Sequence, residues 1–210
     1  MTTFSLLLLF ELTLIILSFT ERVKRFLTML MIQGVLLFGI AYLQLQHINA
    51  LYLAFILLET IIIKGLLVPL FLNQMRKRNN FNRLAHSKVS TFITVMAISA
   101  AIVFGFLLSS NIHDDNLQTK FFAASIATII TGIYFMIVHR NIFTHIIGYL
   151  IMENGVFLFS LAVGSEMPML VNTAILLDIF VGVLVLGIFA NRVGDTFKNM
   201  HVDDLAQLKH

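Results

Sequence analysis

The sequence has no cysteine, and only 12% of its 210 residues are charged. Without thiols the chain cannot ligate an iron–sulfur cluster, form a disulfide or use a thiol nucleophile. No nucleotide-binding loop, catalytic triad or metal-ligand cluster is recognisable in it either. We therefore expect a chain that is not itself an enzyme, with no cofactor, no metal and no nucleic-acid partner. With so few charged residues the chain has almost no segment that could form a water-soluble domain. A reaction that needs such a domain must therefore take place on a partner protein.

Long continuous apolar runs recur along the whole chain, and the mean hydropathy is +0.93. Barrel strands would instead alternate polar and apolar residues, so the pattern predicts an all-α polytopic membrane protein. Each run is close to the ~20 residues that a helix needs to cross the hydrocarbon. The first run carries Glu11 at its centre and no basic segment before it, which favours a mature helix over a signal peptide. We expect seven transmembrane helices, at 3–19, 26–43, 50–72, 89–109, 119–138, 142–164 and 170–191.

The connections between these runs alternate between basic and non-basic. The basic ones are 21–25, 73–88 and 139–141, whereas 44–49, 110–118 and 165–169 hold no Lys or Arg. Because cytoplasmic loops carry the excess of Lys and Arg, the N-terminus is predicted to lie outside and the C-terminal tail in the cytoplasm.

Two pairs of similar segments indicate an internal repeat. Gln33–Phe38 (QGVLLF) is similar to Asn154–Phe159 (NGVFLF), and Ile56–Glu59 (ILLE) to Ile175–Asp178 (ILLD). This favours a 3+1+3 tandem parallel repeat, because a single connecting helix keeps both halves in the same orientation. The predicted parts are 1–72 (first repeat), 73–118 (basic loop, connecting helix and outer loop), 119–191 (second repeat) and 192–210 (cytoplasmic tail). Chance similarity between leucine-rich segments is the alternative.

Five ionisable residues lie inside the predicted spans more than one turn from either end: Glu11, Glu59, Lys64, Glu153 and Asp178. Each charge at the bilayer centre costs roughly 2.5–3.5 kcal/mol on insertion scales, so such residues usually face the bundle interior and indicate function. From the helical rise, the four acids lie roughly 12–17 Å from a span end and therefore near the midplane. Groups at one height suit lateral charge transfer within the membrane plane better than a simple pore along the normal.

Lys64 needs a partner from another helix, since on an α-helix a residue five positions after Glu59 does not face it. With four acids and one base, at least three acids lack a lysine partner in this chain. Buried carboxylic acids without a counter-charge hold protons more tightly than exposed ones, which favours proton transfer. Polar bonding that only holds the helices together is the alternative.

His145, Tyr149 and Glu153 recur every fourth residue on one predicted helix. They form a polar stripe from its cytoplasmic end to the midplane, which would suit an access path for protons. His145, near the helix end, has the simpler alternative of reaching the lipid headgroups.

The segment RNIFTHIIGYLIMENG, residues 140–155, resembles the signature of the hydrogenase-4 component E family. The segment KGLLVPL at 64–70 and the tail DDLAQLKH at 203–210 are also similar to that family. In its last three helices the family is similar to the K subunit of respiratory complex I and to the C subunit of Mrp-type antiporters. The K-type subunit carries two intramembrane glutamates on successive helices. The resemblance implies that Glu153 stands for the first, displaced by about one turn. The second has no match in place, because its position falls near Val183 and Asp178 lies five residues earlier.

The resemblance implies a non-catalytic subunit of a complex I-like hydrogenase assembly in the cytoplasmic membrane of a bacterium or archaeon. Its expected partners are antiporter-like membrane subunits, the membrane anchor of the redox arm and the surrounding lipid. Two alternatives stay open from the residues: a stand-alone proton-coupled transporter, and an assembly scaffold whose charges only pair across interfaces.

Overall fold

The computed structural model describes residues 2–20, 22–44, 54, 57–78, 89–112, 117–139 and 142–163. These residues belong to the first of two compact units, Met1–Asn172. The second unit, Thr173–His210, lies outside the described residues, and so do the predicted span 170–191 with Asp178 and the tail 192–210.

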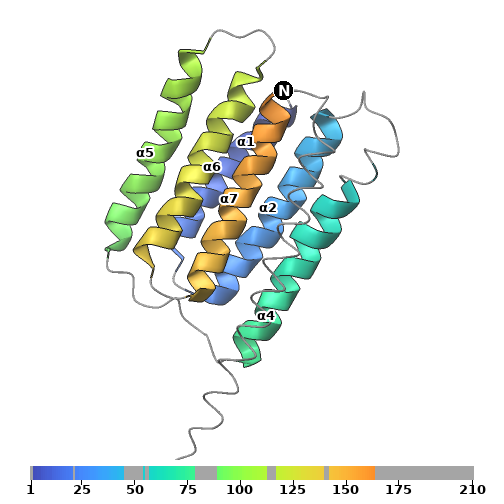
Figure 1. The fold of residues 1–210 in the computed structure, drawn as a ribbon, viewed down its shortest axis with the longest axis vertical. Coiled ribbons are helices and arrows are strands. Elements are labelled where there is room, and N and C mark those ends of the chain that lie inside the picture. The colour runs from blue at the N-terminus through green and yellow to red at the C-terminus, as the bar shows by residue number, and fades with distance from the viewer. Residues whose placement is uncertain are drawn as a thin grey trace, which may run out of the picture. The chain divides into compact units, whose positions relative to one another are not determined.

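Each of the first six predicted spans coincides with helical structure, which confirms the all-helical prediction for the described part of the chain (Figure 1). The elements are α1 (Thr2–Ser18), α2 (Val23–Gln44), η1 (Glu59–Leu67), α4 (Val68–Arg78), α5 (Thr91–Ser110), α6 (Thr119–Val138) and α7 (Ile142–Val163). Among the described residues, four helices are long and apolar enough to cross a membrane: Val23–Gln44, Thr91–Ser110, Thr119–Val138 and Thr144–Val163. Thr2–Ser18 and Thr60–Gln74 are shorter apolar helices. The total of seven spans, the orientation and the 3+1+3 repeat remain predictions.

The third predicted span is not a uniform α-helix, because η1 is a π-helix that continues into α4. Pro69 supplies a physical reason: it has no N–H, and in an α-helix its ring would clash with the carbonyl group of Gly65. A π-helix carries i→i+5 hydrogen bonds, so residues five apart lie nearly above one another. The α-helical spacing used for Glu59 and Lys64 therefore does not describe this segment. The side chain of Glu59 lies outside the described part, so its position relative to Lys64 stays a prediction.

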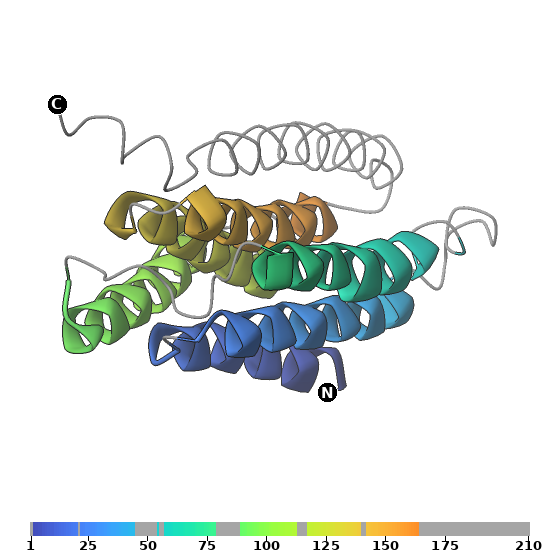
Figure 2. The same ribbon diagram turned by 90° about the horizontal axis from the view of Figure 1, so that it is seen from below.

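The helices α6 and α7 form the most extensive helix–helix contact in the described part of the chain (Figure 2). A Cβ atom on Gly132 would lie 2.6 Å from the carbonyl oxygen of Gly148, and one on Gly148 would lie 2.8 Å from the carbonyl oxygen of Gly132. The two backbones can approach this closely only because neither position carries a side chain, as is common between membrane helices.

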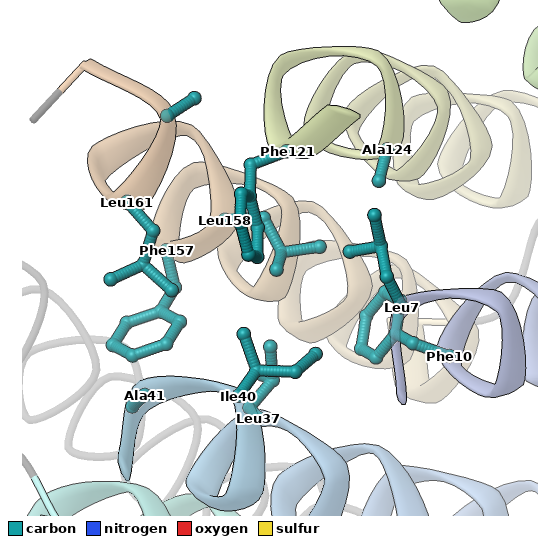
Figure 3. Packing of buried hydrophobic residues seen from close by; sticks show 11 residues of the cluster. Leu7, Phe10, Leu37, Ile40, Ala41, Phe121, Ala124, Phe157, Leu158 and Leu161 are labelled. Atoms are coloured by element: carbon teal, nitrogen blue, oxygen red, sulfur yellow. The ribbon is translucent and has the colours of Figure 1, made fainter. Parts of the chain in front are cut away.

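A buried apolar cluster connects these two helices to α1 and α2 (Figure 3). Its members are Leu7 and Phe10 of α1, Leu37, Ile40 and Ala41 of α2, Phe121 and Ala124 of α6, and Phe157, Leu158, Leu161 and Ala162 of α7. Many large apolar side chains on the outside of the helices are exposed instead, among them Phe92, Val103 and Leu107 of α5. Such a surface is expected where lipid or another membrane subunit covers the protein.

The helix ends beside the non-basic connections lie together at one end of the bundle, as the alternation of basic and non-basic connections predicts. One pocket is lined by the start of α1, the end of α2 and the start of α6. The backbone N–H of Gln118 donates to the carbonyl oxygen of Ala162 near the end of α7. The basic segments follow or precede the opposite ends of these helices.

We predict that the end of α4 faces the cytoplasm and the end of α5 faces outward, because basic residues concentrate beside α4. Single cysteines at Lys77 and Ser110, both exposed, would be treated with an impermeant thiol reagent on intact cells. Labelling of Ser110→Cys and protection of Lys77→Cys are expected; the reverse pattern would invert the topology. Since the chain has no cysteine of its own, the unsubstituted protein is the blank.

Candidate proton-transfer site

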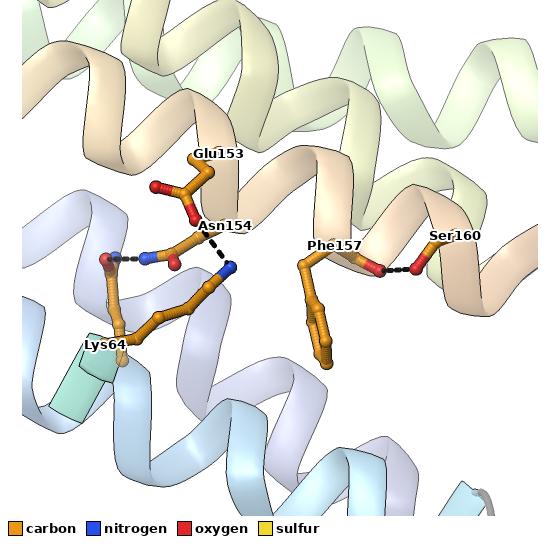
Figure 4. A network of polar contacts seen from close by, with 6 residues as sticks. Lys64, Glu153, Asn154, Phe157 and Ser160 are labelled. Atoms are coloured by element: carbon orange, nitrogen blue, oxygen red, sulfur yellow. Dashed lines mark hydrogen bonds and ion pairs between the residues drawn. The ribbon is translucent and has the colours of Figure 1, made fainter. Parts of the chain in front are cut away.

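The centre of the site is a buried ion pair between two helices that are far apart in the sequence. Nζ of Lys64 on η1 lies 2.8 Å from Oε1 of Glu153 on α7, and each side chain is only 5% exposed (Figure 4). The two atoms are within ion-pair distance, although their orientation is not that of a directed hydrogen bond. The prediction that Lys64 pairs with a carboxylate on another helix is thus confirmed.

The Lys64 ammonium group also contacts the aromatic face of Phe157. Its Nζ lies 4.9 Å from the centre of that ring, and Phe157 is one turn after Glu153 on the same face of α7. A negative carboxylate and the electron-rich face of a ring together stabilise a cation that is withdrawn from water. One helix therefore supplies both of these contacts.

The position of Lys64 depends on a close backbone contact beside it. A Cβ atom on Gly34 of α2 would lie 2.7 Å from Cα of Gly65, so the two helices touch at glycine. The residue before each of these glycines is polar and buried: Gln33 on α2 and Lys64 on η1. The same order recurs on α7, where the buried Asn154 precedes Gly155. Glycine lets the helices approach, and the preceding polar side chain then reaches into the interior.

A chain of hydrogen bonds runs sideways through the bundle next to the ion pair. Nδ2 of Asn154 donates to Oε1 of Gln33 at 3.2 Å, and Nε2 of Gln33 donates to Oγ1 of Thr13 at 2.9 Å. The Thr13 hydroxyl in turn donates to the carbonyl oxygen of Phe10 at 2.6 Å. The chain links α7 through α2 to α1, with all of its side chains buried.

Sequence reasoning did not assign Thr13, Gln33 or Asn154 to the site. A signal for two of them was present, however, since Gln33 and Asn154 are equivalent positions of the predicted repeat, 121 residues apart. In such a repeat, two equivalent residues that contact each other would lie near the axis that relates the two predicted halves. The polar side chain in each otherwise apolar segment could therefore have been recognised as a contact across that axis.

The predicted stripe on α7 becomes steadily more buried toward the ion pair. His145 in the second turn is exposed, Tyr149 is half-buried, and Glu153 is buried. This gradient is what an access path from one membrane surface to a buried acid requires.

Glu11 is buried in a different part of the bundle. It lies on α1, which contacts α2, α5 and α6, and it is 5% exposed. Neither carboxyl oxygen has a hydrogen-bond partner among the described residues. Because an unpaired charge in such a place costs several kcal/mol, the surroundings favour the neutral acid. Glu11 therefore differs from Glu153: Glu153 is paired with Lys64, whereas Glu11 is buried without a hydrogen-bond partner among the described residues.

His139 is a further buried titratable group that sequence reasoning passed over. It follows α6 directly, stacks on Phe135 with ring centres 5.6 Å apart, and Nδ1 lies 3.2 Å from the carbonyl oxygen of Phe135. Burial lowers the pKa of His139 below its ordinary value of 6.5, and the nearby His145 lowers it further, against the opposing effect of the Phe135 carbonyl. Within the described residues, no three His, Cys, Asp or Glu side chains gather as metal ligands would.

We predict strong coupling between Lys64 and Glu153. Removing one partner of a buried pair leaves an uncompensated charge and costs about 3–5 kcal/mol, whereas removing both leaves none. Lys64→Met and Glu153→Gln should each lower the melting temperature of the purified protein, and the double variant should recover most of the loss. Additive losses in the double variant would contradict the pair. Glu153→Gln leaves the Lys64 ammonium group buried without its counter-charge.

A second prediction concerns pH. The folded state holds a proton on His139 less tightly than the unfolded state does, so stability falls as the pH drops below about 6.5. Melting temperatures measured across this range should decline less steeply in His139→Gln than in the wild type. His145→Gln removes only the effect of His145 on His139 and leaves the larger effect of burial, so it should change the slope less than His139→Gln does. Identical slopes in wild type and His139→Gln would show that His139 does not titrate differently on unfolding.

Comparison with known proteins finds one related family. Residues 120–210 match the family model of NADH-ubiquinone/plastoquinone oxidoreductase chain 4L. The matched segment begins in α6 and includes Glu153 and Asn154, and it agrees with the predicted similarity of the last three helices to the K subunit of complex I. No curated protein and no solved structure matches the chain significantly. The match and the apolar helices support a multi-pass membrane subunit of a complex I-like assembly.

Proposed function

We propose that this chain is a non-catalytic membrane subunit of a complex I-like hydrogenase assembly, and that the Lys64–Glu153 pair takes part in redox-coupled proton translocation. The observation that carries the proposal is the pair itself. It joins η1, in the first half of the chain, to α7, which lies within the segment similar to chain 4L. A structural ion pair could be replaced by apolar residues without loss of function, whereas a proton-transfer pair could not.

The chemistry follows from the linkage between the proton on Glu153 and the position of Lys64. While Glu153 is ionised, its carboxylate attracts the ammonium group at 2.8 Å. When the carboxylate takes up a proton, that attraction is lost and Lys64 is free to move toward another acceptor. Lys64 lies in a π-helical segment, and irregular helical turns of this kind are frequent at functional sites. Proton occupancy is thereby converted into a displacement of charge that a neighbouring subunit can sense.

Protons would reach Glu153 along the stripe of His145 and Tyr149, because both side chains lie between the helix end and the ion pair. On this proposal Glu59 and Asp178 extend the lateral path toward antiporter-like subunits and the membrane anchor of the redox arm. The bacterial or archaeal cytoplasmic membrane is the expected location. Metal centres and electron transfer would belong to the partners.

The decisive variant removes the titratable carboxyl without stranding a charge. In Lys64→Met/Glu153→Gln neither residue can carry a proton, yet no buried charge is left unpaired. Redox-driven proton uptake by inverted membrane vesicles, normalised to assembled complex, should fall about tenfold or more. Glu153→Asp, which keeps the carboxyl and shortens its reach, should retain part of the activity.

The matched control is Ser160→Ala on the same helix. Its hydroxyl group is buried and donates only to the carbonyl oxygen of Phe157, so its loss should leave proton uptake unchanged. Full uptake by an assembled double variant would mean that the pair is structural. Uptake by the purified chain alone in proteoliposomes would identify a stand-alone transporter instead of a subunit.

A further inference from the structure

A pocket with both polar and apolar lining residues opens at the end of the bundle where α1 and α6 begin and α2 ends. Its volume is about 510 Å³, and it lies among the start of α1, the end of α2 and the start of α6. The lining residues are Thr3, Phe4, Leu7, Gln44, Leu117, Gln118, Thr119, Lys120 and Phe121. The proton-transfer site described above uses none of them.

The pocket has a polar mouth and an apolar floor. Thr3, Gln44 and Gln118 are only half-buried, and Lys120 is exposed with its ammonium group 4.9 Å from the centre of the Phe4 ring. A lysine in this arrangement, with its stem along an aromatic ring and its charge in water, is typical of the membrane–water interface. At the other side of the pocket, Leu7 and Phe121 are buried members of the apolar cluster.

The pocket lies over the same face of α1 as Glu11. Leu7 precedes Glu11 by one helical turn, and Thr3 precedes Leu7 by one more, so the three residues share a face. The rise from Leu7 to Glu11 is roughly 6 Å. Leu7 is therefore a buried lining residue of the pocket that lies one helical turn from Glu11 on the same face of α1.

Glu11 itself needs an exchange partner that the described helices do not supply. Both of its carboxyl oxygens are buried without a hydrogen-bond partner among the described residues. The hydrogen-bonded chain from Asn154 through Gln33 ends at Thr13, two residues from Glu11 on α1. Its amide groups do not take up and release protons, so the chain holds α1 against the Glu153 helix and leaves Glu11 to exchange protons by another route.

We propose that the pocket is an outer vestibule through which Glu11 exchanges protons with water, with Leu7 and Phe121 as the closed gate between them. In each cycle the O–H bond of neutral Glu11 breaks and vestibule water takes the proton as hydronium. The carboxylate then takes up a proton that water carries from the Glu153 site, since the amide chain between the two sites cannot carry it. The inference rests on the proposed proton translocation and adds the exit. The cytoplasmic stripe on α7 and this vestibule would then open to opposite faces of the membrane.

The vestibule can be tested by the accessibility of introduced cysteines, because the chain has no cysteine of its own that would also react. Leu7→Cys and Leu8→Cys lie at the same depth, but Leu7 faces the pocket whereas Leu8 is 47% exposed on the outer surface of the bundle. A negatively charged, impermeant thiosulfonate should react with Leu7→Cys in the assembled complex at least about tenfold faster than with Leu8→Cys, because thiols react as thiolates in water and not in lipid. Phe121→Cys, at the floor on α6, serves if Leu7→Cys fails to assemble.

The side of attack and the effect on pumping complete the test. Reaction should occur from the outer face of intact cells, and it should block redox-driven proton uptake in Leu7→Cys but not in Leu8→Cys. Glu11→Gln should lower proton uptake about tenfold while Leu7→Cys in that background still reacts. Equal reactivity of the two cysteines, or reaction from the cytoplasmic face, would overturn the vestibule.

The two proposals fail separately. If Glu11→Gln pumps normally while Lys64→Met/Glu153→Gln does not, the exit through Glu11 is wrong and proton transfer through the ion pair stands. If both variants pump normally, the ion pair has no role in proton transfer, and the proposed exit through Glu11 is wrong as well.

Discussion

A lysine ammonium group buried in an apolar helix bundle requires an opposite charge, and this requirement connects most of the features of the described structure. The partner of Lys64 is Glu153, which lies three predicted spans later in the chain. Satisfying the pair fixes how close η1 must come to α7, and therefore how close α2 must lie to η1. The Phe157 ring and the contact between Gly34 and Gly65 are arranged around the same group.

The buried polar groups of the bundle fall into two classes with different consequences. Ser125, Thr128 and Thr131 on α6 donate to carbonyl oxygens of their own helix, so they are satisfied wherever that helix lies. Thr13, Gln33 and Asn154 bond across helices and specify which helices are neighbours. Glu11 belongs to neither class, since it is buried without a partner among the described residues. Ionisable groups buried in a membrane interior without a partner are rare, and they are the usual starting point for a functional hypothesis.

The similarity to chain 4L covers the part of the chain from α6 onward, and the first half contributes Lys64, Gln33 and Glu11. The residues that meet at the centre thus come from both parts. Lys64 and Glu153 couple them electrostatically, and Gln33 and Asn154 couple them through an amide–amide hydrogen bond. Because the amide pair joins positions that are equivalent in the predicted repeat, the contact between the halves would lie near a local axis in the membrane interior.

The sequence by itself determined the class of the protein, the approximate bounds of six helices and the fact that Lys64 must find a carboxylate elsewhere. These conclusions depend on quantities that are local or additive: the length of each apolar run, the cost of each buried charge and the count of acids against bases. The tertiary structure alone decided which carboxylate Lys64 meets, that the third span winds as a π-helix and that Gln33 bonds Asn154. It also decided that a pocket lies among the start of α1, the end of α2 and the start of α6. Each of these depends on distances between helices that no local pattern encodes, since a single close contact between Gly34 and Gly65 sets where the lysine can reach.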